Sequence, residues 1–169
     1  MHNAALEALG LDYVYAAFHV APDALPQAMA GMRALELAGL NVTVPHKQAV
    51  MAHLDEISPE AQAIGAVNTV CNRDGRLSGF NTDAFGIIES LKADGGMDPL
   101  PARVALLGAG GAARAILYAL LAREEVVEVL LINRTVEKAE TLKGDLDGAG
   151  KVRVKSLADI GAIADAGLL

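Results

Sequence analysis

A short apolar run at 104–107 leads directly into Gly108-Ala109-Gly110-Gly111-Ala112-Ala113 and then into a helical pattern. A strand, a tight glycine turn and a helix in this order are typical of a unit that binds a dinucleotide. Gly108 permits the turn, Gly110 lets the backbone approach a pyrophosphate, and the small Ala113 lets helix and strand pack closely. The helix N-terminus would offer N–H groups to phosphate. We predict a nucleotide site at 108–112; a structural glycine turn is the alternative.

The end of the next predicted strand indicates which dinucleotide this turn accepts. NAD-specific sites place Asp or Glu there, roughly 20 residues past the glycines, to hold the ribose 2′-hydroxyl. This chain instead has Asn133-Arg134-Thr135, with Lys138 one helical turn further on. A carboxylate would repel the extra phosphate of NADP, whereas a guanidinium pairs with it. NADP is therefore the predicted cofactor. A solvated helix start would explain Lys138 but leaves the missing acid unexplained.

Strands and helices alternate regularly after a linker at 94–101 that is dense in glycine and proline. We expect strands at 103–107, 128–132 and 152–154, helices at 111–122, 135–143 and 157–163, and a further strand opening at 167–169. Regular β-α alternation predicts a parallel sheet. The region 99–169 is therefore expected to be a partial Rossmann dinucleotide-binding domain.

The residues before the linker combine strand and helix signals. Asp74-Gly75 is a strong hairpin signal between strand-like runs at 66–72 and 77–80. We also expect strands at 13–20 and 40–44, helices at 1–9, 22–37 and 83–93, and two short helices from Pro45 onward. Hydrophobic residues make up 53% of the chain and aromatic residues only 4%, so the core must be aliphatic, as in α/β proteins. The predicted fold class is α/β, with an N-terminal α/β domain at 1–98.

Two charged residues of this first domain stand out as candidates for chemistry. Lys47 is expected in the first turn of a helix opened by Pro45, where the helix dipole opposes a cation. Such a lysine would give up its proton more readily, which suits a general acid or base. Asp83 begins another predicted helix, and Asn68 is polar among apolar neighbours. An exposed Lys47, a capping Asp83 and an Asn68 paired with backbone are the alternatives.

Composition excludes several classes of function. The net charge of −7 argues against nucleic acid as a partner, since phosphate binding needs a basic face. The single cysteine, Cys71, excludes an internal disulfide and fits a reducing cytoplasm. The four histidines show no ligand spacing, so no metal site is expected. Neither a signal peptide nor a membrane span is expected, because glycines and Arg114 interrupt the most apolar stretch, 104–122.

Four motifs, in this order, resemble the shikimate dehydrogenase family across essentially the whole chain. They are Asn41-Val42-Thr43-Val44-Pro45-His46-Lys47, Gly65-Ala66-Val67-Asn68-Thr69, Gly79-Phe80-Asn81-Thr82-Asp83, and the glycine turn at 108–112 followed by Asn133-Arg134-Thr135. The resemblance implies that 1–98 is the substrate domain. It also implies reversible, NADP-dependent reduction of 3-dehydroshikimate to shikimate, a step of aromatic amino-acid biosynthesis in the cytoplasm.

The resemblance also assigns roles to residues. Lys47 and Asp83 would be the catalytic pair, with Lys47 moving the proton and Asp83 holding the hydroxyl and the ammonium. Thr43, Asn68 and Asp83 would bind the small hydroxy-acid substrate, and Asn41 would shape the strand that presents them. The glycine turn and the residues from Asn133 to Lys138 would bind NADP.

The chain departs from the family pattern at both ends. The family begins with a strand and a loop whose two serines hold the substrate carboxylate, and it continues past Asp165 with further motifs. We therefore expect this chain to lack the first strand of the substrate domain and to be poorly stable and inactive by itself. A quinate or dual quinate/shikimate dehydrogenase and a non-catalytic NADP- or metabolite-binding module remain alternatives, and a homodimer is left open.

Overall fold

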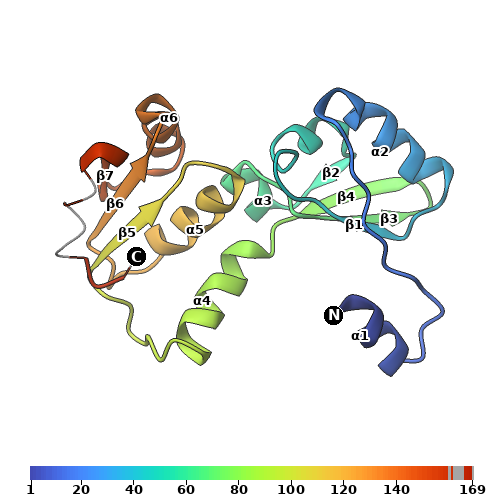
Figure 1. The fold of residues 1–169 in the computed structure, drawn as a ribbon, viewed down its shortest axis with the longest axis horizontal. Coiled ribbons are helices and arrows are strands. Elements are labelled where there is room, and N and C mark those ends of the chain that lie inside the picture. Colours follow the sequence, from blue (N-terminus) through green and yellow to red (C-terminus); the bar gives the residue numbers. More distant parts are fainter. Residues whose placement is uncertain (160, 162–165, 169) are drawn as a thin grey trace.

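The computed structural model describes residues 1–159, 161 and 166–168. Figure 1 shows two units, each a sheet with helices packed on it, which lie side by side with α3, α4 and α5 between them. The fold class is α/β, as predicted. In the described part of the chain, no helix is long and apolar enough to cross a membrane.

The sheet of the second half contains three parallel strands in the order β5-β6-β7. Helices α5 and α6 connect them, so the predicted β-α alternation is confirmed. Leu168 forms a parallel bridge with Val104, where a further strand was expected to open. The helix expected at 157–163 lies partly outside the described residues. The bounds are β5 (Arg103–Leu107), α5 (Gly111–Leu121), β6 (Glu128–Asn133), α6 (Val136–Leu146) and β7 (Val152–Ser156).

One apolar core holds this sheet to its helices. Alternate residues of the strands face it, among them Val104, Leu106, Val129 and Leu131, because successive side chains of a strand point to opposite faces. The buried stripe of α5 packs on them through small and aliphatic side chains. Helix α4 (Asp83–Ala93) packs on α5 and adds Ala84 and Ile88 to the same core. The start of α4 is thereby held close to the start of α5.

The sheet of the first half has four strands in the order β1-β3-β4-β2. Strands β3 and β4 form the predicted hairpin, with φ of +53° at Asp74 and +82° at Gly75. The second core, which includes Leu25, Met32 and Leu77, lies between this sheet and its helices. The bounds are η1 (Pro22–Ala24), α2 (Leu25–Ala34), β1 (Gly39–Asn41), η2 (Ala49–His53), β2 (Glu56–Ile57), α3 (Pro59–Ile64), β3 (Thr69–Arg73) and β4 (Arg76–Phe80).

The N-terminal segment differs from the prediction. The prediction of a strand at 13–20 is wrong: these residues form no strand, and Val14 and Phe18 are exposed. A β-rich sequence becomes a strand only when a neighbouring strand pairs with it, and no described strand pairs with this segment. Helix α1 (His2–Ala8) was predicted and lies apart from both sheets (Figure 1). Asn3 attaches it to Tyr15 through two hydrogen bonds with the Tyr15 backbone.

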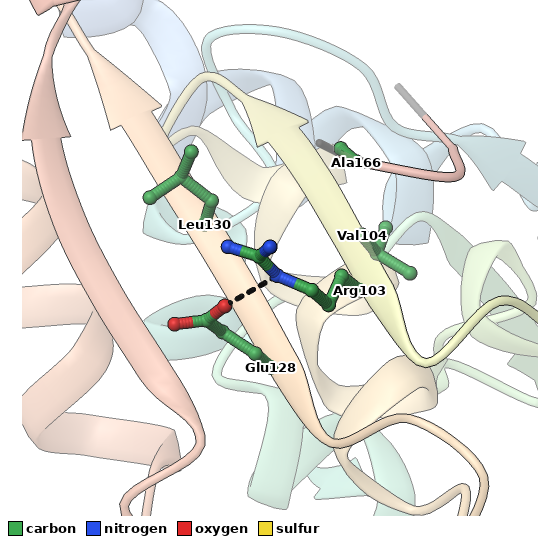
Figure 2. Close-up of a pocket in the computed structure, with 5 residues that line it drawn as sticks. All are labelled: Arg103, Val104, Glu128, Leu130 and Ala166. Atoms are coloured by element: carbon green, nitrogen blue, oxygen red, sulfur yellow. Dashed lines mark hydrogen bonds and ion pairs between the residues drawn. The ribbon is translucent and has the colours of Figure 1, made fainter. Parts of the chain in front are cut away.

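The amino ends of β5, β6 and β7 carry a row of charged side chains. Glu128 pairs with Arg103 at 2.8 Å and, on its other side, with Arg153. Figure 2 shows Arg103 and Glu128 lining a small pocket together with Val104, Leu130 and Ala166. Ligands of open α/β sheets bind beyond the carboxyl ends of the strands, so this pocket lies at the wrong edge for a dinucleotide.

The Glu128 row gives a pH-dependent prediction. The hydrogen bond from Arg103, assisted by the charges of both arginines, holds the pKa of Glu128 below its ordinary range. A lowered native pKa stabilises the fold above the ordinary carboxyl range and loses that effect as the pH falls through the lowered value. In urea unfolding from neutral pH to about pH 3, the stability difference between wild type and Glu128→Gln should therefore shrink at acidic pH. A difference that is constant with pH would contradict this.

Candidate functional site

Lys47 and Asp83, 36 residues apart in sequence, meet between the two units. The Lys47 Nζ atom lies 2.5 Å from Asp83 Oδ2, and the two side chains are only 12% and 29% exposed. Asp83 is the first residue of α4, but its carboxylate turns toward Lys47, and no side-chain cap is described at the Thr82 N-cap. The capping interpretation of Asp83 is therefore wrong, and a partly buried ion pair takes its place.

The reason for which Lys47 was selected does not hold. No helix begins at Pro45: residues 44–45 and 47–48 form turns, and the five-residue 3₁₀ helix η2 starts only at Ala49. The helix-dipole argument therefore does not apply to Lys47. Its environment comes instead from Asp83 and from Val67, whose N–H donates to the Lys47 carbonyl at 2.8 Å.

Asn68 holds the carboxylate of this pair. Its Nδ2 donates to Asp83 Oδ1 at 2.7 Å and to Thr82 Oγ1 at 3.0 Å. Its Oδ1 accepts from the Thr82 N–H and from the Thr69 hydroxyl. Both amide hydrogens are thus used within the protein, so a substrate contact from Asn68 would have to replace one of these bonds. The sequence left open whether backbone or a ligand pairs with the Asn68 amide. In the structure its partners are side chains and backbone of the protein itself.

Asn81 is a site residue that the sequence analysis did not select. Its side chain is buried, its Nδ2 donates to the Ala66 carbonyl at 2.9 Å, and its Oδ1 accepts from the Asp83 N–H at 3.0 Å. It therefore fixes the backbone of the catalytic candidate Asp83 to the segment that leads to Asn68. The available signal was a second amide side chain beside an apolar strand, since a buried amide needs partners.

The glycine turn lies directly against Lys47. A Cβ atom added at Gly111 would come within 2.9 Å of the Lys47 Cβ, so a larger residue would displace the lysine stem. Gly108 has φ of +105°, which only glycine adopts without strain, and its N–H donates to the Ile132 carbonyl at 2.8 Å. The first N–H groups of α5 have no partners within the helix. They lie in the same region as the Lys47–Asp83 pair.

The second half of the predicted cofactor site adjoins this turn. Strands β5 and β6 are parallel neighbours with Leu107 opposite Ile132, so their carboxyl ends meet at one edge. Asn133 ends β6 and donates to the Thr135 carbonyl at 2.7 Å, which shapes the turn before α6. Arg134 and Lys138 are exposed there. These features fit a dinucleotide with a 2′-phosphate. The glycine turn leaves room for the pyrophosphate, the first N–H groups of α5 can bind it, and Arg134 stands where an NAD-specific site has an acid.

Thr43, another predicted site residue, lies four residues before Lys47 in the sequence. It is exposed, and its carbonyl accepts from the His46 N–H at 2.8 Å. Within the described ranges, no hydrogen bond joins its hydroxyl to Lys47, Asn68 or Asp83. Asn41 pairs with Thr69 between β1 and β3.

Cys71 is a free, half-buried thiol, and among the described residues no group of His, Cys, Asp or Glu could hold a metal ion.

Comparison with known families gives two matches. The model of the shikimate dehydrogenase substrate binding domain matches residues 1–70, and that of shikimate / quinate 5-dehydrogenase matches residues 95–167. The chain is 47% identical over 152 residues to the shikimate dehydrogenase (NADP(+)) of Carboxydothermus hydrogenoformans, covering 90% of this chain and 53% of that protein.

Solved structures give the same result. Shikimate 5-dehydrogenase of Thermus thermophilus, in complex with NADP(H) and shikimate, superposes with a TM-score of 0.77 at 47% identity, covering 91% of this chain and 56% of that one. The 5-ketofructose reductase of a Gluconobacter strain gives 0.72 at 39% identity, with 91% and 55% covered. The chain spans about half the length of the curated relatives it matches.

Proposed function

Since the chain belongs to the shikimate dehydrogenase family, we propose that it serves, within the gene product that carries it, the reversible NADP-dependent reduction of 3-dehydroshikimate to shikimate. The observation that carries this proposal is the Lys47–Asp83 pair at 2.5 Å, with the lysine stem against Gly111. A proton-transfer group beside a dinucleotide turn is what reduction of a carbonyl by a nicotinamide requires. The reaction would belong to aromatic amino-acid biosynthesis in the cytoplasm.

In this proposal Lys47 carries the proton. Its Nζ donates a proton to the carbonyl oxygen as the alcohol forms and accepts it in the reverse direction. Asp83 holds that nitrogen through Oδ2, while Asn68 holds the other carboxylate oxygen, so the direction of the Lys47 side chain is set in advance. Thr43 and Asn68, together with Asp83, are the proposed substrate contacts.

NADP is the proposed cofactor. Bound NADPH would supply the hydride. The pyrophosphate would lie on the N–H groups at the start of α5, along Gly108-Ala109-Gly110-Gly111-Ala112. Asn133 and Thr135 would shape the turn under the adenosine ribose, and Arg134 with Lys138 would pair with the 2′-phosphate. The proposed domain boundary at 98/99 assigns this site to the second domain.

Titration calorimetry of the 169-residue chain with NADP+ and NAD+ tests the cofactor part of the proposal. We expect NADP+ to bind about 10-fold more tightly or better, because one charge-assisted hydrogen bond contributes about 1.5–3 kcal/mol. Equal affinities would contradict the assignment of Arg134 to the 2′-phosphate. If neither nucleotide binds, the glycine turn at 108–112 has only a structural role. NADPH oxidation with 3-dehydroshikimate by the gene product then tests the reaction.

Two alternatives differ in measurable ways. The second family model covers quinate as well as shikimate dehydrogenases, so comparing the kcat/KM values for shikimate and quinate separates a dual enzyme from a specific one. A non-catalytic binding module would bind NADP and leave 3-dehydroshikimate unreduced. The partly buried Lys47–Asp83 pair favours catalysis, because binding alone does not need a buried amine that contacts the nucleotide turn. The sequence leaves a homodimer open.

A further inference from the structure

We propose that Arg114 is a positioning residue that holds the Lys47–Asp83 pair in register with the nucleotide-binding helix α5. Arg114 lies in α5, three residues after Gly111, and its side chain is only 11% exposed. Its contacts join three elements that are distant in sequence. The catalytic consequence rests on the proposed function, whereas the positioning itself does not.

The first contact reaches into the substrate unit. Arg114 Nε donates to the carbonyl of Ile64, the last residue of α3, at 2.7 Å. The last carbonyls of a helix have no partner within the helix, so a charged donor on α5 satisfies one of them. The ends of α3 and α5 are thereby joined by a charge-assisted hydrogen bond.

The neighbouring glycine makes room for this contact. Gly65 has φ of +71°, and a Cβ atom there would come within 2.7 Å of Arg114 Nη2 and 3.1 Å of Nε. The guanidinium therefore packs against the backbone at Gly65, and any side chain at this position would push it away. The left-handed turn at Gly65 and the position of Arg114 depend on each other.

The second contact ties the same guanidinium to the other cofactor helix. Arg114 Nη1 lies 2.8 Å from Asp145 Oδ2 on α6, the helix that begins just after the proposed 2′-phosphate site. Arginine presents several N–H donors in a rigid plane, so one residue can hold a carbonyl and a carboxylate in fixed directions, which lysine cannot do. Helices α5 and α6 are thus held to α3 by one side chain.

The segment that follows Gly65 carries the site. The Ala66 carbonyl accepts from Asn81, the Val67 N–H donates to the Lys47 carbonyl, and Asn68 donates to the Asp83 carboxylate. All three bonds lie within four residues of the carbonyl that Arg114 holds. A shift of α5 would therefore move the donors and acceptors that orient Lys47 and Asp83. Arg114 sets where the proton-transfer pair lies relative to the nucleotide turn.

The test compares Arg114→Ala and Arg114→Lys with a control variant, Arg76→Ala. The control removes an exposed ion pair between Arg76 and Glu56 in the substrate sheet. Hydrogen exchange at the Val67 and Asn68 amides of the chain is expected to accelerate about 10-fold or more in both Arg114 variants, while the β6 amides and the control stay at wild-type rates. Unchanged exchange at Val67 and Asn68 would overturn the proposal. If Arg114→Ala fails to fold, hydrogen exchange in Arg114→Lys and Asp145→Asn decides whether the proposal holds. Asp145→Asn removes only one of the two contacts, so its exchange should accelerate less than that of Arg114→Lys.

Kinetics of the gene product give the second readout. We expect Arg114→Ala to lower kcat about 10- to 100-fold, because small misplacement of reacting groups is costly, with the KM for NADPH within about threefold. A higher KM at unchanged kcat would mean a nucleotide-binding role and would overturn positioning. If wild type and control also lack activity, the proposed function fails while the exchange result still decides whether Arg114 holds the segment.

Discussion

Replacing Lys47 with alanine is expected to lower kcat for reduction of 3-dehydroshikimate by about 10²- to 10⁴-fold, the usual contribution of a general acid or base. The variant removes the nitrogen that lies 2.5 Å from Asp83 and leaves no other described amine at this position. NADP+ affinity should change by less than about threefold, since the loss falls on the chemical step. Steady-state kinetics and calorimetry of the gene product measure the two quantities.

Lys92 offers the matched control for this variant. It lies in the last turn of α4, the helix that begins with Asp83, and Lys92→Ala removes the same charge away from the site. Its kcat should equal that of the wild type. A Lys47→Ala variant that retains full turnover would favour the non-catalytic binding module, provided that NADP+ still binds.

Replacing Arg134 with aspartate is expected to weaken NADP+ binding roughly 100-fold, because a charge-assisted bond worth about 1.5–3 kcal/mol is lost and a like charge is introduced. NAD+ should bind as well as before or better, since an acid at the end of this strand accepts from the ribose 2′-hydroxyl. Arg134 is exposed after β6, so the substitution disturbs no core packing. Titration of both nucleotides measures the change in selectivity.

Arg134→Lys distinguishes charge from geometry. It keeps the cation but loses the planar pair of donors, so NADP+ affinity should fall to a value between wild type and Arg134→Asp. Raising the salt concentration should reduce the difference between wild type and Arg134→Asp, because the charge is exposed. If both variants bind NADP+ like the wild type, Arg134 does not contact the 2′-phosphate, and Lys138 becomes the residue to test.

Local sequence patterns were sufficient for several elements of the fold. The predicted strand at 103–107, the glycine turn and the hairpin at Asp74-Gly75 all appear as expected. Each depends on residues close together in the chain: on alternating burial, on glycine where φ is positive, or on a two-residue turn. The strand predicted at 13–20 was wrong because a strand also requires a partner, which its own residues do not encode.

The sequence was sufficient to select the residues of the candidate site, but only tertiary packing determines how they are arranged. Lys47 was selected for a helix that does not exist, and Asp83 was given an alternative as a cap that its carboxylate does not fill. Only the tertiary structure brings the amine to the carboxylate, adds Asn81 to their support, and places Arg114 between α3 and α6. Such contacts join residues dozens of positions apart, and their geometry depends on how the two cores set α3, α4 and α5 against one another, which no local pattern can specify.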